Sequence, residues 1–151
     1  MTTRSIATLV GLAAACATTV RAVVDDAHSY ALEAAADAVA QGVELRADYA
    51  HGTLAPGGKA KVSYQVFKGS SYWFFVGGSE EGMEMSIHVT DADGKPVEGQ
   101  RKSAPQAVVF HFTAKRTGMV TVEVSGRLPS PTVFNWAVVY GFRADGGGTK
   151  E

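Results

Sequence analysis

Hydrophobic and polar residues follow two different patterns within residues 71–94, SYWFFVGGSEEGMEMSIHVTDADG. Residues 72–76 form a continuous apolar run, which is typical of a strand buried on both faces. In residues 83–90 apolar side chains alternate with polar ones, which predicts a half-buried strand leading into an aspartate- and glycine-containing turn. We expect these to be two core strands of a β-sandwich, with Trp73 and Ile87 in a shared interior.

Short segments with a similar alternation recur to the end of the chain, and turns rich in glycine, proline and aspartate separate them. Because no helical pattern interrupts them, the sequence predicts an all-β fold. The expected fold is an antiparallel, jelly-roll-like β-sandwich of about eight strands. The further strands are expected at residues 43–53, 61–67, 96–98, 106–113, 119–125 and 133–142. Apolar residues expected to face the core in two of these strands are Val108, Phe110, Phe112, Val120, Val122 and Val124.

An alanine-rich segment before the strands, Asp25–Gln41, predicts one N-terminal helix that ends at Gly42. Helical spacing places apolar residues on one narrow side, which we expect to dock either onto the sandwich or onto a partner. The residues of this expected docking side are Leu32, Ala35, Ala36 and Val39.

The first residues resemble an export signal, with Arg4 followed by an apolar run that is too short to span a membrane. Small residues before Val23 predict cleavage at that position. A weaker match to a bacterial lipobox offers an alternative, in which Cys16 would carry a lipid. The expected organisation is a signal peptide at 1–22, the helix at 23–42, the sandwich at 43–142 and a flexible tail at 143–151, in an exported protein.

Composition narrows the classes of function. The chain has 151 residues with 46% hydrophobic residues, enough for the core of one domain. Its net charge is −1, and loss of a leader with Arg4 and Arg21 would lower this to −3. With no dense run of lysine or arginine, nucleic acid is not an expected partner. The single cysteine lies in the expected leader, so the mature chain would have no disulfide and no thiolate metal site.

The order of several motifs resembles the bacterial pre-peptidase C-terminal (PPC) type of jelly-roll domain. The resemblance covers residues 53–142 and is carried by turn and packing signals. Its motifs are the aromatic strand 72–76, the alternating residues 84–89, the D-x-D-G turn 91–94, and the strands 108–113 and 117–124. It implies a module associated with secreted hydrolases that binds carbohydrate or protein and, in some members, calcium. Glu84 and Ser86 stand where the family has aspartates, which departs from its acidic ligand pattern.

Acidic residues at the two ends of the 83–90 strand are candidate calcium ligands, because Ca²⁺ takes six to eight converging oxygen ligands. A strand of this length separates the two groups by roughly 20 Å, so each would need ligands from other loops. The alternative is that they are solvated turn residues. The candidates are Glu80, Glu81 and Glu84 in one group and Asp91 and Asp93 in the other.

Aromatic residues are candidate ligand contacts, since exposed rings can form a platform for sugars. Trp73 and Phe75 lie on one side of their strand, and Trp136 has the polar neighbour Asn135; the alternative for all three is packing in the core. We found no nucleophile motif and no paired histidines at metal-binding spacing. The leading hypothesis is an exported, non-enzymatic module that binds an extracellular carbohydrate or protein. The alternative is an envelope assembly protein that docks a partner through the helix or an edge strand.

Overall fold

The computed structural model describes residues 19–144, with side chains from Asp26 onward. Within these residues one helix, α1 (Thr19–Ala40), precedes nine strands. The strands are β1 (Glu44–Leu45), β2 (Ala50–Leu54), β3 (Ala60–Val66), β4 (Ser71–Gly78), β5 (Glu84–Thr90), β6 (Gln100–Ala104), β7 (Ala107–Thr113), β8 (Gly118–Arg127) and β9 (Phe134–Arg143).

The strands form two antiparallel sheets. In the first sheet the order is β1-β9-β4-β7-β6, and β2 pairs with an earlier part of β9 than β1 does. In the second sheet the order is β3-β8-β5. Most connections carry the chain from one sheet to the other, as in a jelly roll. The predicted antiparallel sandwich with an N-terminal helix is confirmed.

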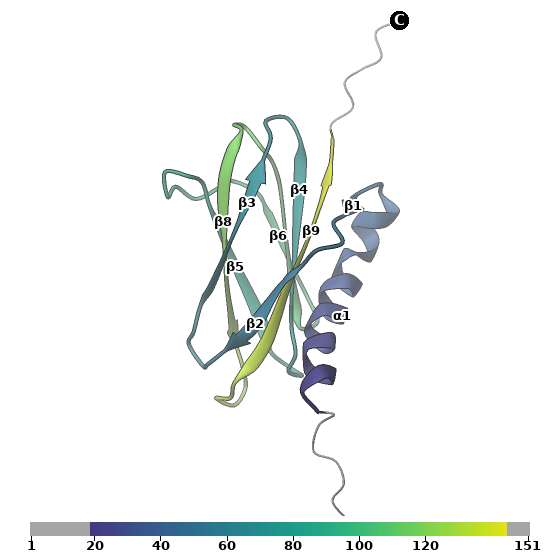
Figure 1. The fold of residues 1–151 in the computed structure, drawn as a ribbon, viewed down its shortest axis with the longest axis vertical. Coiled ribbons are helices and arrows are strands. Elements are labelled where there is room, and N and C mark those ends of the chain that lie inside the picture. The colour runs from purple at the N-terminus through teal and green to yellow at the C-terminus, as the bar shows by residue number, and fades with distance from the viewer. Residues whose placement is uncertain (1–18, 145–151) are drawn as a thin grey trace, which may run out of the picture.

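Helix α1 adds a third layer. It lies on the face of the first sheet that points away from the second sheet, which we call the outer face, and it contacts β4, β7 and β9 (Figure 1). Strands β4 and β9 are therefore covered on both sides. Phe74 is fully buried between the sheets and Phe75 is fully buried under the helix, which accounts for the continuous apolar run in β4.

The core between the sheets contains the alternating residues expected from the sequence. Its fully buried side chains include Phe74 and Val76 from the first sheet and Val122 and Val124 from the second. The expectation that Trp73 and Ile87 share this interior was wrong. Ile87 lies in it, whereas the alternation of β4 puts Trp73 on the outer face. The other inward-facing residues, as predicted, are Met83, Met85, Val89, Val108, Phe110, Phe112 and Val120.

The docking side of α1 agrees with the expected one only at Ala35, since Leu32, Ala36 and Val39 are exposed. Ala27, Ala31 and Ala35 are fully buried against the sheet, while Leu32 and Val39 are 40% and 46% exposed. The reason is the closeness of the helix to Gly77 of β4, where an added Cβ would lie 2.1 Å from the Ala27 carbonyl oxygen. Only small side chains fit between a helix and a sheet at this distance.

Two strands also differ from the prediction. The expected strand 43–53 is split into β1 and β2, because residues 46–49 leave the ladder with β9. The expected strand 96–98 is reduced to one bridge, Thr90 to Pro96, since proline has no N–H to extend a ladder. The next strand is the polar edge strand β6, which has no apolar alternation to reveal it.

The start of α1 and the end of β9 differ from the segment boundaries expected from the sequence. Helix α1 begins at Thr19, before the expected cleavage position, and β9 continues to Arg143, the first residue of the expected tail. Cys16 and residues 145–151 lie outside the described residues. Within residues 19–144 no helix has the length and apolar character needed to span a membrane.

Candidate functional site

The end of α1 leaves part of the outer face uncovered. The helix stops at Ala40 because Gly42 adopts a positive φ of 91°, and the Val43 N–H bonds back to the Ala38 carbonyl oxygen at 3.0 Å. Phe75 lies under the helix, whereas Trp73, two residues earlier on the same face of β4, is only partly buried. The helix length thus decides which aromatic residue of β4 lies near solvent.

Trp73 is held between two neighbours from adjacent strands. Its ring stacks on His111 of β7, with ring centroids 4.0 Å apart and an interplanar angle of 8°. The Arg143 guanidinium of β9 lies over the Trp73 ring, 5.4 Å from its centroid. Because β7 and β9 flank β4 on opposite sides, the two partners cover opposite faces of the indole. A ligand would therefore meet the edge of Trp73 rather than a free face.

This stack forms one wall of a surface cavity of about 700 Å³, which we call the Trp73 basin. The basin is bounded by the end of α1 and by β4, β6, β7 and β9. Side-chain amides and basic groups dominate its polar lining, and none of the lining residues is acidic. The lining residues are Gln41, Trp73, Gln100, Arg101, Lys102, Val109, His111 and Arg143.

Of the three aromatic candidates, only Trp73 belongs to this basin. Phe75 is fully buried against Ala31 and Ala35, and Trp136 is 7% exposed, inside the core between the sheets. Gly52 of the paired strand β2 leaves room for the Trp136 ring, since a Cβ there would lie 3.1 Å from it. Phe75 and Trp136 are thus packing residues in this structure and offer no ring face to a ligand.

The candidate calcium ligands Asp91 and Asp93 belong to the turn after β5. The Asp91 Oδ1 accepts hydrogen bonds from the backbone N–H groups of Asp93 and Lys95, at 2.9 and 3.0 Å. Arg116 bridges both carboxylates, at 3.2 and 3.3 Å. The hydrogen bond from Lys95 is the main cause that lowers the pKa of Asp91, and the other two groups act in the same direction.

The remaining acidic candidates lie at the opposite end of β5. Glu84 forms an ion pair with Arg127 of β8, Glu80 accepts a hydrogen bond from the Ser79 hydroxyl at 3.3 Å, and Glu81 is exposed. In the described part of the chain, histidines and acidic residues do not gather in any group of three or more suited to a metal ion. Calcium binding stays a prediction.

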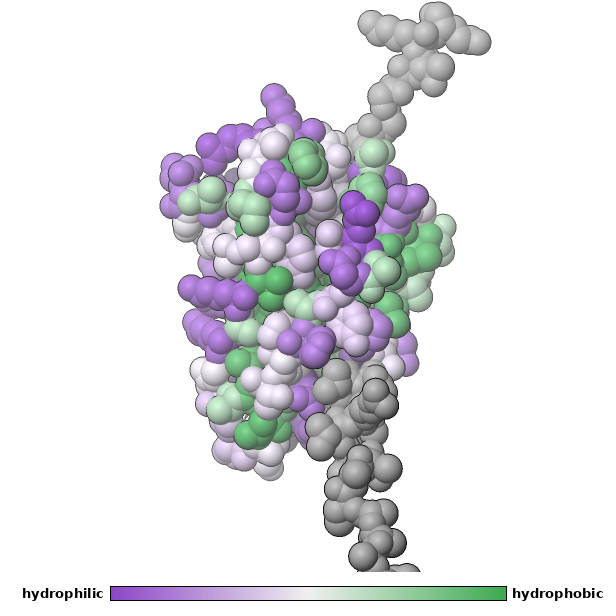
Figure 2. All heavy atoms as spheres, viewed as in Figure 1, coloured by the Kyte–Doolittle hydropathy of each residue, from purple (hydrophilic) through white to green (hydrophobic). Residues whose placement is uncertain are grey.

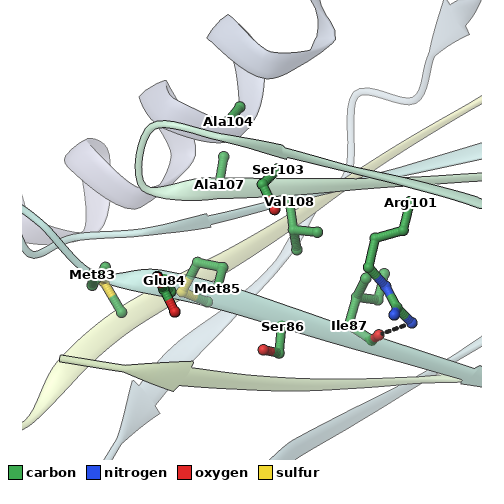
Figure 3. Close-up of a pocket in the computed structure, with 10 residues that line it drawn as sticks. All are labelled: Met83, Glu84, Met85, Ser86, Ile87, Arg101, Ser103, Ala104, Ala107 and Val108. Carbon is green, nitrogen blue, oxygen red and sulfur yellow. Dashed lines mark hydrogen bonds between the residues drawn. The ribbon is translucent and has the colours of Figure 1, made fainter.

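A second cavity, of about 340 Å³, opens where the edges of the two sheets diverge (Figure 3). Met83 and, from β5, Met85 and Ile87 line one side, and β6 and the start of β7 line the other. An Arg101 Nη2–H donates to the Ile87 carbonyl oxygen at 2.8 Å, so a side chain from β6 caps part of the β5 edge. This contact also directs the Arg101 guanidinium away from the outer face.

A third cavity, also of about 340 Å³, lies at the other open edge of the sandwich and is lined by Tyr49, Tyr64 and Tyr140 beside Asp48. The Tyr64 ring packs against Tyr140 and Phe74, with centroids 4.6 and 5.0 Å apart. Its hydroxyl is buried and, among the described residues, has no hydrogen-bond partner. The sequence indicated that Tyr64 faces inward but gave no signal that Tyr140 of β9 would pack against it.

Comparison with known proteins adds no identification. No protein-family model matches the chain, and no curated protein matches it. The resemblance to the PPC type of domain therefore stays a prediction, and the interpretation of the molecule depends on its own geometry.

The Trp73 basin is the cavity whose chemistry best suits a polar ligand. Glutamine amides both donate and accept hydrogen bonds, and arginine and lysine donate them with a positive charge. Sequence reasoning found Trp73 but missed Gln41, Lys102, His111 and Arg143. These residues come from the turn after α1 and from β6, β7 and β9, and no spacing along the chain connects them.

Proposed function

We propose that this protein is an exported, non-enzymatic binding module that takes an extracellular carbohydrate in the Trp73 basin. The observation that carries the proposal is the uncovered end of the outer face, where amide and basic side chains surround the rigid stack of Trp73, His111 and Arg143. A rigid aromatic centre with a few polar groups around it is the usual composition of a small-ligand site.

Rigidity supports binding because the site is already ordered before a ligand arrives. The stack fixes Trp73 and Arg143, and both lie on strands of the central sheet rather than on long loops. Side chains that are already ordered lose less conformational entropy on binding. Glutamine and arginine side chains at the rim match the alternating donors and acceptors of sugar hydroxyl groups.

A glycan array probed with residues 23–151 tests this proposal. Trp73→Ala should abolish the binding of any glycan that the parent protein binds, because it removes the centre of the stack. Phe67→Ala is the matched control, since Phe67 is an exposed aromatic residue, 58% accessible, that does not line the basin. An array without a bound glycan, or equal binding by Trp73→Ala and the parent protein, would contradict the proposal.

One observation favours the second candidate function, an assembly role for the helix. Leu32, Ala36 and Val39 are exposed on the side of α1 that does not contact the sheet. Hydrophobic side chains gather at the right-hand edge of the molecule, where α1 lies (Figure 2). Apolar positions repeated along one helix side are the usual form of a helix that docks in a groove.

Light scattering coupled to size-exclusion chromatography separates the two candidates. If the helix drives self-assembly, the parent protein should elute as an oligomer and the double variant Leu32→Gln/Val39→Gln as a monomer. A parent protein that is monomeric over the accessible concentration range would leave only docking onto a different protein. A monomer that also binds no glycan would count against both functions.

A further inference from the structure

We infer that the ligand of the Trp73 basin is an acidic carbohydrate whose carboxylate is bound by Arg143 and Lys102. This inference rests on the proposed function and narrows it to a class of sugar. Its starting point is the distribution of ion pairs over the molecule.

Five of the eleven lysine and arginine residues whose side chains the structure describes form an ion pair with a carboxylate. The other six described basic residues form no ion pair, and three of these six, Arg101, Lys102 and Arg143, line the basin. The basic residues that do form ion pairs are Lys59, Lys61, Lys115, Arg116 and Arg127. The basin is therefore a site of uncompensated positive charge on a protein with a net charge of −1.

The acidic residues near the basin do not neutralise its positive charge. Glu98 precedes the basin residue Gln100 by two positions, but it is paired with Lys115 at 2.9 Å. Asp37 lies one helical turn before Gln41 and does not line the basin. Glu44 and Leu45 are consecutive residues of β1, so their side chains point to opposite faces of the sheet. Leu45 packs on the outer face, and the Glu44 side chain therefore points away from the basin.

Arg143 is arranged as a carboxylate receptor. The Trp73 ring supports its guanidinium, and an Nη1–H donates to the Gln41 carbonyl oxygen at 3.4 Å. Both contacts are with neutral groups, so they orient the guanidinium without cancelling its charge. Arginine binds carboxylates through two parallel N–H groups, and an ordered guanidinium loses little entropy in doing so.

Lys102 lies on the same face. In the β6–β7 ladder it is opposite Val109, and Gln100 is opposite His111, so both β6 side chains project beside the stack. Two cations around one cavity match a single carboxylate on a sugar ring, whereas a nucleic acid would need a longer basic track. The amides of Gln41 and Gln100 remain for the hydroxyl groups of the same sugar.

Matched polysaccharides test the inference. We would measure binding of oligogalacturonate, hyaluronan and alginate by calorimetry, each alongside its carboxyl-reduced counterpart, which keeps the sugar chain but removes the charge. At least one acidic polymer should bind, and its reduced form should bind at least about tenfold more weakly. The affinity for the acidic polymer should also fall as salt is raised from 50 to 300 mM, because salt screens exposed charges.

Variants assign the effect to the basin. Arg143→Gln and Lys102→Gln should each weaken binding of the acidic polymer about tenfold or more, and Arg143→Lys should restore only part of the loss, since lysine lacks the planar fork. Lys68→Gln is the matched control, because it removes the same charge from an exposed turn outside the basin. Unchanged melting temperatures would show that the variants are folded.

The failures are distinguishable. If acidic and reduced polymers bind equally, or if Lys68→Gln weakens binding as much as Arg143→Gln, the inference is wrong while carbohydrate binding stands. If neither the acidic polymers nor their reduced forms bind, and the glycan array is also empty, the proposed function itself is wrong.

Discussion

The buried hydroxyl of Tyr64 leads to a stability prediction with an unusual sign. Tyr64→Phe should stabilise the protein, because the hydroxyl has lost its contact with water without gaining a described hydrogen-bond partner. A buried polar group left unsatisfied costs about 1–3 kcal/mol. The void left by one oxygen atom costs a few tenths of a kcal/mol, at about 24 cal/mol per Å³. The ring contacts with Phe74 and Tyr140 remain, so the net gain should be about 1 kcal/mol.

Tyr72 provides a control with the opposite expectation. Its hydroxyl accepts a hydrogen bond from the Phe67 backbone N–H at 2.8 Å, so Tyr72→Phe removes a used acceptor and should destabilise the protein by about 1 kcal/mol. Both variants delete one oxygen from a tyrosine of the sandwich. Urea denaturation at pH 7, with equal m-values, would measure both changes.

Tyr64→Phe should also change how the stability of the protein responds to alkaline pH. Burial, followed by the charges of Tyr140 and Asp48, raises the pKa of Tyr64, so the folded state keeps the proton longer than the unfolded state does. Stability of the parent protein should therefore fall once the pH exceeds 10.0, the ordinary value, and Tyr64→Phe should lack this contribution. Above that pH, the difference in free energy of unfolding between Tyr64→Phe and the parent protein should grow by at most about 1.4 kcal/mol per pH unit. A variant that is less stable than the parent protein at pH 7 would refute the reasoning, since the hydroxyl would then have a favourable partner.

Three further predictions concern the layers and the turn after β5. Gly77→Ala should cost about 3 kcal/mol in denaturation, because its Cβ would collide with the Ala27 carbonyl oxygen, whereas Gly118→Ala, with open space around it, should change little. Phe74→Ala should lose about 3–5 kcal/mol by the same assay, since its fully buried ring fills the space between the sheets; a smaller loss than Gly118→Ala would contradict the observed packing. Asp91→Ala should lower the melting temperature at pH 7. Because the pKa of Asp91 is lowered in the folded state, its stabilisation is present above the ordinary value of 3.8 and lost below it. A difference that persists at pH 2 would show that the carboxylate charge is not the cause.

The sequence predicted the sandwich well because its strands bury alternate residues. The run at 72–76 correctly indicated a strand covered on both sides, but it could not indicate which layer covers which residue. Trp73 was assigned to the same interior as Ile87, although only even-numbered positions of that run face the second sheet. The alternation of residues shows which side chains share a face of a strand, but it does not show which layer of the fold packs against each face.

The helix shows a different limit. Hydrophobicity favoured Leu32 and Val39 as docking residues, whereas the structure buries alanines. The cause is Gly77, far away in the sequence, which brings the helix so close that larger side chains have no room. The polar strand β6 escaped prediction for a related reason, because backbone pairing with β7 places it and its side chains carry no apolar signal.

For the basin, the sequence identified its central ring and little else. Trp73 could be selected as an aromatic residue beside buried ones, but His111 and Arg143 become its neighbours only through the ladders of β4 with β7 and β9. Phe75 and Trp136 were equally plausible aromatic candidates until the helix and the second sheet were seen to enclose them.

The position of the anchoring alanines along α1 has a consequence for maturation. The helix starts at Thr19, yet Ala27, Ala31 and Ala35 all follow the expected cut after Ala22. A peptidase acting there would shorten the helix by about one turn and keep all three anchors in the product. The first turn of the helix would then contain the cleavage position, and the later turns would hold the helix against the sheet.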